Sequence, residues 1–424
     1  MSTQNEVRDF LLGLKKESKI YFTGTTTRNP IEYKTGEPIV FKIRVEADGE
    51  YVEVPYIYYT TEGDDGEKSD GYLEPGADGY FYIETSLKRD GFVRVIAKAC
   101  DENKNEIAEV DPFQGGAGAD VDKIKCETDI PDDYLDFWKS LKEAAFAVPE
   151  QVLFQEEIAA PEGFVAFSAR YATPTGKYIS VVYSYPKDAK EKSLKVRFSN
   201  MGYGVDDCVP FFKKGYLIVR ANTHDILNGQ SPEYYKEKQK ELDGYGLRDR
   251  KANEKPETSF WYKLYFRDFQ VIKYFMNHPL ANRIDYVFEG GSQAAFQSVN
   301  LAAHSGIATQ ARLHIPWFCD IFAIQKQKRI TIDWRPLEDD GLRYFDTAVG
   351  GQFLKCPVYI EAGLGDYTCP PSGQLALYNG IKAPKKLRFV QNRTHAYLSP
   401  VIITNEISDG YDQAEFFFNL GLLL

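Results

Sequence analysis

The segment RIDYVFEGGSQAAFQSVNLAAHSG, residues 283–306, changes its pattern at a single serine. Its first part is an apolar run that ends in two glycines, whereas after Ser292 the sequence becomes rich in alanine and typical of a helix. A strand, a tight turn and a helix in this order can hold a serine hydroxyl on a strained turn. The segment therefore predicts a nucleophile elbow at Ser292.

The elbow pattern is usually written G-x-S-x-G, and here it reads Gly290-Gly291-Ser292-Gln293-Ala294. Alanine in place of the last glycine adds one methyl group where the helix packs on the strand. Taken alone, an ordinary Gly-Ser turn before a helix explains this segment equally well. The residues that follow the serine along the chain decide between the two interpretations.

An acid and a histidine follow the serine, each after a strand-like run. In CPVYIEAGLGDYTCPPS, residues 356–372, the apolar run leads to Asp366, and in KLRFVQNRTHAY, residues 386–397, it leads to His395. The chain order Ser, Asp, His is that of the α/β-hydrolase fold. We predict that His395 is the general base for Ser292 and that Asp366 orients the imidazole.

The other four histidines compete for these roles. His278, His304 and His314 lie in or just after segments with a helical pattern and are predicted to be structural. His224 follows the strand-like run GYLIVRAN and could approach a site at the carboxyl edge of the sheet, so it is a candidate substrate contact, with a structural role as the alternative.

An oxyanion formed at the serine needs hydrogen-bond donors already in place. The backbone N–H of Gln293, at the start of the helix, is one predicted donor. The second is expected from the loop MGYGVDD, residues 201–207, because its Gly202 and Gly204 permit close approach of the backbone to a ligand.

The remaining sequence divides into two parts. Residues 37–111 alternate apolar and polar positions between Gly/Asp-rich turns, which predicts an immunoglobulin-like β-sandwich over residues 1–114. The glycines of QGGAGAD suggest a linker over residues 115–128. From residue 129, a helix start in IPDDYLDFW and alternating strand-like and helix-like runs predict an α/β-hydrolase domain, residues 129–424, with a mostly parallel central sheet.

The composition and charge of the chain indicate which binding partners and which cellular location to expect. The net charge of −11 disfavours nucleic acid, and no apolar run of ~18 residues predicts a membrane span. The start MSTQNEVRDF lacks a signal-peptide pattern, so we expect a cytoplasmic protein, or a secreted or periplasmic one if a signal peptide has been removed. The six widely spaced cysteines are expected to be free thiols.

No cofactor or metal site is predicted. The segment beginning DENKNE at Asp101 resembles the opening of a calcium loop, but its sixth position is Glu106 where glycine is needed, and its twelfth is Pro112 where a glutamate is needed. We expect a solvated turn there.

Several collinear motifs resemble the acetyl xylan esterase and cephalosporin C deacetylase family: IPDDYLDFW, GLRD, GGSQ, YFDTAV, CPVYIEAGLGDYTCPPS and LYNGI. The resemblance implies an α/β-hydrolase with its triad at Ser292, Asp366 and His395, and with oxyanion donors at Gln293 and at the backbone N–H of Tyr203. The compact members of that family form hexamers and lack the N-terminal sandwich, so the resemblance implies a homo-oligomer only if the added sandwich permits that assembly.

The chain departs from that family at three places. The family's HGY reads Met201-Gly202-Tyr203, its RGQ reads Arg220-Ala221-Asn222, and the glutamate after its histidine is Ala396. We expect a serine esterase that deacetylates acetylated carbohydrates such as xylan-type oligosaccharides. The alternatives are an esterase or peptidase with another acyl preference, and an inactive carbohydrate-binding protein.

Overall fold

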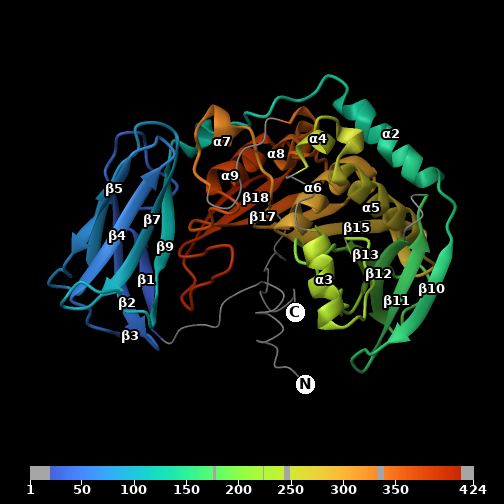
Figure 1. Ribbon diagram of the computed structural model, residues 1–424, viewed down its shortest axis with the longest axis horizontal. Helices are drawn as coiled ribbons and strands as arrows, with labels where there is room; N and C mark the ends of the chain where they lie inside the picture. The colour runs from blue at the N-terminus through green and yellow to red at the C-terminus, as the bar shows by residue number, and fades with distance from the viewer. Residues whose placement is uncertain (1–19, 175–177, 223, 243–248, 332–338, 412–424) are drawn as a thin grey trace.

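The computed structural model describes residues 20–174, 178–222, 224–242, 249–331 and 339–411 (Figure 1). Part of the predicted GLRD motif, residues 246–248, and the two ends of the predicted domains, residues 1–19 and 412–424, lie outside these ranges. Two N-terminal sheets stand at one end of the molecule and pack beside a larger α/β part (Figure 1).

The N-terminal module consists of two sheets. Its strands are β1 (Ile20–Thr26), β2 (Ile39–Ala47), β3 (Glu50–Tyr51), β4 (Tyr56–Gly63), β5 (Lys68–Leu73), β6 (Phe81–Thr85), β7 (Gly91–Cys100), β8 (Val110–Asp111) and β9 (Phe113–Ala119). One sheet has the order β3-β2-β1-β8 with β6 beside β2, and the other has the order β5-β4-β7-β9. Every named pairing is antiparallel except β1 with β8.

Alternating side chains of both sheets meet in one core. Phe41 and Ile43 of β2 pack in the same apolar cluster as Val93 and Val95 of β7. Because side chains in a strand alternate between faces, the period-two pattern places one face of each sheet inside. The predicted packing of strands is confirmed, whereas the immunoglobulin-like class remains a prediction.

The predicted linker of residues 115–128 differs from the structure at its start. Residues 113–119 form strand β9, which pairs with β7. A Cβ at Gly115 would collide with the Gln391 side chain, and one at Gly116 would lie 2.6 Å from the Leu364 carbonyl oxygen. The glycines therefore allow close packing between the module and the α/β part, where the sequence suggested a linker.

The second part is built on one ten-stranded sheet with the order β10-β11-β12-β14-β13-β15-β16-β17-β18-β19. These strands are β10 (Val152–Ile158), β11 (Phe164–Ala172), β12 (Tyr178–Pro186), β13 (Leu194–Phe198), β14 (Tyr216–Ala221), β15 (Ala281–Gly291), β16 (Gln310–His314), β17 (Val358–Gly363), β18 (Lys385–Val390) and β19 (Thr404–Asp409). Strands β14 to β18 are parallel, and the flanking pairs are antiparallel. The sheet is thus mixed and largely parallel, as predicted for its centre.

Helices bury the apolar surface of this sheet. Those described are α2 (Tyr134–Ala147), α3 (Pro232–Leu242), α4 (Arg250–Asn253), α5 (Phe260–Met276), α6 (Gln293–Ser305), α7 (Ala323–Lys326), α8 (Thr347–Gly351) and α9 (Pro371–Gly380), with short 3₁₀ turns η1 (Val121–Lys123), η3 (Pro256–Thr258) and η4 (Asp340–Phe345). The predicted helix at IPDDYLDFW is α2, whose Trp138 packs edge-on against Tyr265 of α5. No helix of the described residues is long and apolar enough to cross a membrane.

The His304 ring lies in this helical core and makes stability depend on pH. It stacks on Trp138 with 4.5 Å between ring centroids, its Nε2 lies 3.2 Å from the Tyr134 hydroxyl, and burial lowers its pKa to about 3. The unfolded chain binds a proton near pH 6.5, whereas the folded chain does not. The folded state therefore loses stability as the pH falls from 6.5 toward 3.

We expect His304→Gln to remove this dependence. Between pH 7 and 4.5 the wild type should lose about 2 kcal/mol that the variant keeps, since each unit of pKa difference is worth ~1.4 kcal/mol and partial exposure of the ring reduces the total. Urea unfolding of both proteins at the two pH values measures the difference. Parallel losses of stability in the two proteins would exclude the effect.

Candidate active site

Strand β15 turns into helix α6 at Ser292. The serine has φ 53° and ψ −120°, in the left-handed half of φ space that a side chain rarely adopts. Its N–H donates to the His314 carbonyl oxygen (2.9 Å), which fixes the turn against β16. A Cβ at Gly290 would collide with the backbone of Ala294, so only glycine fits where the helix crosses the strand. This is the geometry of a nucleophile elbow.

The three predicted triad residues meet at the carboxyl ends of their strands. Ser292 Oγ lies 3.1 Å from His395 Nε2, and His395 Nδ1 lies 3.0 Å from Asp366 Oδ2. The Asp366 side chain follows β17 and is fully buried, whereas the His395 side chain follows β18 and is 30% exposed. The geometry predicted from chain order is therefore present: a buried acid, a histidine and a serine in one line.

Backbone donors hold Asp366 in place. Its Oδ1 accepts hydrogen bonds from the N–H groups of Thr368 (3.1 Å) and Cys369 (2.9 Å), which leaves Oδ2 for His395. These two hydrogen bonds fix the rotation of the carboxylate group. The carboxylate is therefore oriented before any substrate binds.

A buried polar group supports the base from behind. Arg393, two residues before His395, donates from Nη2 to His314 Nε2 (2.7 Å), and His314 Nδ1 lies 3.1 Å from Glu361 Oε1. Burial, together with the neighbouring Arg393 charge, lowers the pKa of His314, so the ring is neutral and its Nε2 accepts. The prediction that His314 is structural is confirmed, and its links to both Ser292 and Arg393 were not predicted.

The N-terminal module holds the same loop from the other side. The Gln391 side chain accepts from the Gly116 N–H and donates to the Gly116 carbonyl oxygen, both at 3.0 Å. Asn392 donates to the Phe22 carbonyl oxygen (3.1 Å) and accepts from the Gln114 N–H (2.9 Å). The loop that carries His395 is thus bonded to β1 and β9, a contact that only the glycines of β9 could have signalled in the sequence.

We expect Asn392→Gly to lower kcat about tenfold, because small displacements of a catalytic group are costly. Glycine suits this position, since Asn392 has φ 50°. The matched control is Asn379→Ala, which also removes two hydrogen bonds from one asparagine, those to the Val121 and Ile124 carbonyl oxygens, but leaves the His395 loop untouched. If both variants keep the wild-type kcat in ester hydrolysis, the module does not position the base.

The predicted oxyanion donors lie on α6 and on the loop after β13. Gln293 is the first residue of α6, so its N–H has no partner within the helix. Tyr203 stands on the loop and is 63% exposed. Gln297, one turn along α6, fastens the loop: its Oε1 accepts from Asn200 Nδ2 (2.9 Å), and its Nε2 donates to the Met201 carbonyl oxygen (3.3 Å). Gln297 is not among the residues predicted from the sequence.

His224 proves to be a support of this loop. Its ring is buried, its Nε2 lies 3.1 Å from the Tyr203 carbonyl oxygen, and burial lowers its pKa to about 4. The ring also stacks on Phe260. With its pKa this low, the neutral ring donates from Nε2 to Tyr203. The structure therefore favours the structural alternative for His224 over a substrate contact.

Among the described residues, one group could offer metal ligands: Asp366, Cys369 and His395, whose ligand atoms lie within 4.8 Å of one another. The Asp366 oxygens already accept from His395 and from the Cys369 N–H, and His395 Nε2 faces Ser292. These contacts suit a proton-transfer system better than a cation site, and we assign no metal to it. All six cysteines are free thiols, as predicted.

The largely parallel sheet and the serine elbow at the end of β15 define the α/β-hydrolase fold. The family described as acetyl xylan esterase (AXE1) matches residues 119–331 and 339–408. The chain belongs to this acetyl xylan esterase family.

One curated protein and two solved structures are similar to this chain. The acetyl esterase Axe7A of Xylanibacter ruminicola is 22% identical over 290 residues, which cover 63% of this chain and 64% of that protein. The acetyl xylan esterases of Paenibacillus sp. R4 and Thermoanaerobacterium sp. JW/SL YS485 superpose with TM-scores of 0.54 and 0.53 at 17% and 16% identity. Each comparison covers 66% of this chain, and 94% and 93% of those chains, respectively. Membership of the acetyl xylan esterase family indicates a carboxylic ester hydrolase.

Proposed function

We propose that the protein is a serine esterase that deacetylates acetylated carbohydrates through an acyl-enzyme. The observation that carries the proposal is the unbroken contact from Ser292 Oγ to His395 Nε2 (3.1 Å) and from His395 Nδ1 to Asp366 Oδ2 (3.0 Å). Membership of the acetyl xylan esterase family supports acetyl as the acyl group.

In the proposed first half-reaction, His395 Nε2 takes the Ser292 proton while Oγ attacks the acetyl carbonyl carbon. The negative oxygen of the tetrahedral intermediate accepts hydrogen bonds from the backbone N–H groups of Gln293 and Tyr203. The imidazolium then gives its proton to the departing sugar oxygen, and the acetyl group remains on Ser292. The carboxylate of Asp366 stabilises the positive imidazolium throughout.

In the second half-reaction, His395 takes a proton from water, whose oxygen attacks the acetyl carbon. Collapse of this intermediate breaks the bond to Ser292 Oγ, which recovers its proton from His395, and acetate leaves. No other cofactor or co-reactant is needed, because water supplies both the oxygen and the protons.

We also propose how the chain is divided into domains. We assign residues 129–424 to the catalytic domain and the first 114 residues to an immunoglobulin-like module, with β9 extending the module to Ala119. Contacts of Gln391 and Asn392 with β1 and β9 support a role for this module in positioning the His395 loop.

Acetate release from acetylated xylo-oligosaccharides by the full chain tests the function, with acetyl, butyryl and octanoyl p-nitrophenyl esters compared in parallel. A deacetylase should prefer the acetyl ester. Rates that rise with chain length would indicate a different acyl preference, and failure to react with a serine-directed fluorophosphonate would indicate an inactive binding protein.

A further inference from the structure

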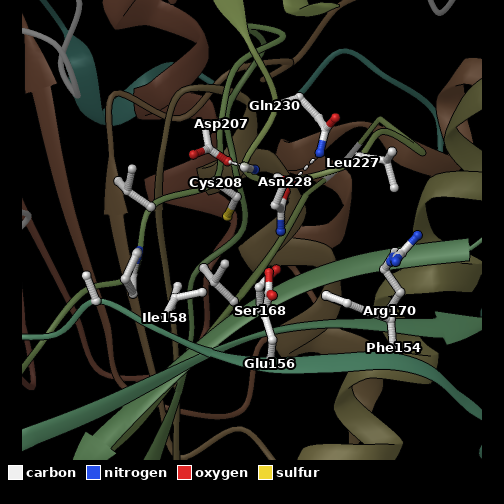
Figure 2. A pocket seen from close by; sticks show the side chains of 15 residues that line it. Phe154, Glu156, Ile158, Ser168, Arg170, Asp207, Cys208, Leu227, Asn228 and Gln230 are labelled. Carbon is white, nitrogen blue, oxygen red and sulfur yellow. Dashed lines mark hydrogen bonds between the residues drawn. The ribbon is translucent and has the colours of Figure 1, made fainter.

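A cavity of about 320 Å³ lies at the far end of the large sheet from the N-terminal module, between the β10–β11 pair and two loop segments, residues 207–210 and 227–230 (Figure 2). Its floor is one face of the strand pair, where Phe154 stands opposite Arg170 and Glu156 stands opposite Ser168. This volume is at the lower end of the range for small-molecule sites.

The opposite wall presents a hydrogen-bond donor to this floor. The Asn228 side-chain oxygen accepts from Asn222 Nδ2 (3.0 Å), which identifies the other amide atom as nitrogen. That Nδ2 atom is buried and has no hydrogen-bond partner in the described part of the chain. Figure 2 shows the Asn228 side chain directed across the cavity toward the carboxylate of Glu156. A buried donor of this kind calls for an acceptor, which a ligand would supply.

The charges of the lining select the chemistry of that ligand. The Arg170 guanidinium lies 4.3 Å above the Phe154 ring, and the carboxylate of Glu156 lines the same cavity. Because these two charges are opposite, a ligand with a net charge is attracted by one residue and repelled by the other, so the lining favours a ligand without net charge. A ligand hydroxyl group can hydrogen-bond to both sides of the cavity, because its oxygen accepts from the Asn228 amide and its hydrogen is donated to the Glu156 carboxylate. Ile158 and Val182 supply apolar surface for the C–H groups of a ring.

The cavity also adjoins the loop that carries the second predicted oxyanion donor. Cys208 and Val182 of its lining pack against Met201, two residues before Tyr203. The other lining loop, residues 227–230, follows His224, whose ring contacts the Tyr203 carbonyl oxygen. Both loop segments that line the cavity therefore lie next to residues that contact or precede Tyr203.

We propose that this cavity binds an uncharged pyranose unit of a glycan. If the pyranose belongs to the acetylated glycan that is hydrolysed, the inference rests on the proposed function. If it belongs to a separate oligosaccharide, the inference is independent of that function. Both ligands would make the same contacts in the cavity, and kinetic measurements distinguish them.

Binding is tested with unacetylated trisaccharides, which the esterase reaction cannot consume. Calorimetric titration of the full chain with xylotriose, cellotriose and maltotriose should detect binding of at least one. Glu156→Leu and Asn228→Ala should each weaken it about tenfold, whereas Glu157→Leu, on the same strand but facing the other way, should not. Absence of binding by all three sugars, or equal binding by the wild type and all variants, overturns the proposal.

The kinetic arm identifies the source. If the pyranose belongs to the substrate, Glu156→Leu should raise KM for acetylated xylotriose about fivefold more than KM for p-nitrophenyl acetate. If titration shows a loss of xylotriose binding while the two KM values change equally, the cavity takes a separate oligosaccharide. Xylotriose binding without any acetate release by the wild type would refute the proposed function and leave the binding site standing.

Discussion

Replacing Ser292 with alanine should abolish acetate release, with kcat falling by about 10⁴- to 10⁶-fold. The Ser292 hydroxyl contacts His395 Nε2 at 3.1 Å and is the only group of the protein that forms a bond to the acetyl carbon in the proposed mechanism. The backbone turn is held by the Ser292 N–H and carbonyl groups, which alanine keeps. The fold should therefore survive, and a thermal unfolding scan should place the midpoint close to that of the wild type.

Ser298 provides the matched control. It lies on the same helix, is also buried, and its hydroxyl donates to the Ala294 carbonyl oxygen (2.8 Å), a local bond with no part in the triad. Ser298→Ala should keep wild-type kcat on p-nitrophenyl acetate. Equal activity of the two variants would remove Ser292 from the mechanism.

Asp366→Asn should lower kcat by about 10⁴-fold while leaving the geometry of the site intact. The reason lies in the backbone donors of this loop. Because the N–H groups of Thr368 and Cys369 point at Oδ1, the oxygen of an asparagine amide must occupy that position. Its NH₂ group then faces His395 Nδ1, which must accept, so the imidazole proton moves to Nε2. A protonated Nε2 cannot take the proton of Ser292.

The Asp366→Asn variant distinguishes the role of Asp366 in orienting His395 from its role in packing. The asparagine fills the same volume and keeps both backbone hydrogen bonds, so unfolding by urea should change little. Labelling of Ser292 by a fluorophosphonate should slow in parallel with kcat, because both reactions need the activated hydroxyl. A variant that retains kcat within about tenfold of the wild type would show that Asp366 does not set the tautomer.

The core of this site was predictable because its signals are local. The change from strand to helix at Ser292, and the runs that lead to Asp366 and His395, can be identified from hydrophobic periodicity. Parallel strands bring their carboxyl ends to one edge, so chain order alone predicted that the three side chains meet. The structure places them at hydrogen-bonding distances.

What the sequence did not reveal depends on contacts between distant segments. Glycine is common both in linkers and where two segments pack closely. The composition of QGGAGAD predicts a linker, whereas Gly115 and Gly116 lie in β9 against the His395 loop. Gln297 resembled any polar residue of an amphipathic helix until the loop it fastens was known.

The buried ion pairs could not be predicted from the sequence either. Glu289, near the end of the strand that leads to Ser292, pairs with Arg197 of β13 and lies 3.7 Å from Arg312 of β16. A charged residue in an apolar run suggests an exposed position, and only pairing across neighbouring strands makes its burial affordable in free energy. Such pairing cannot be assigned before the strand order is known.

The most direct measurement is peptide mass spectrometry after reaction of the full chain with a fluorophosphonate, because this reagent reports which serine the site activates. The account predicts a single adduct on Ser292, its disappearance in Asp366→Asn over the same interval, and loss of acetate release in proportion to labelling. An adduct on another residue, or undiminished acetate release from protein fully modified at Ser292, would contradict it.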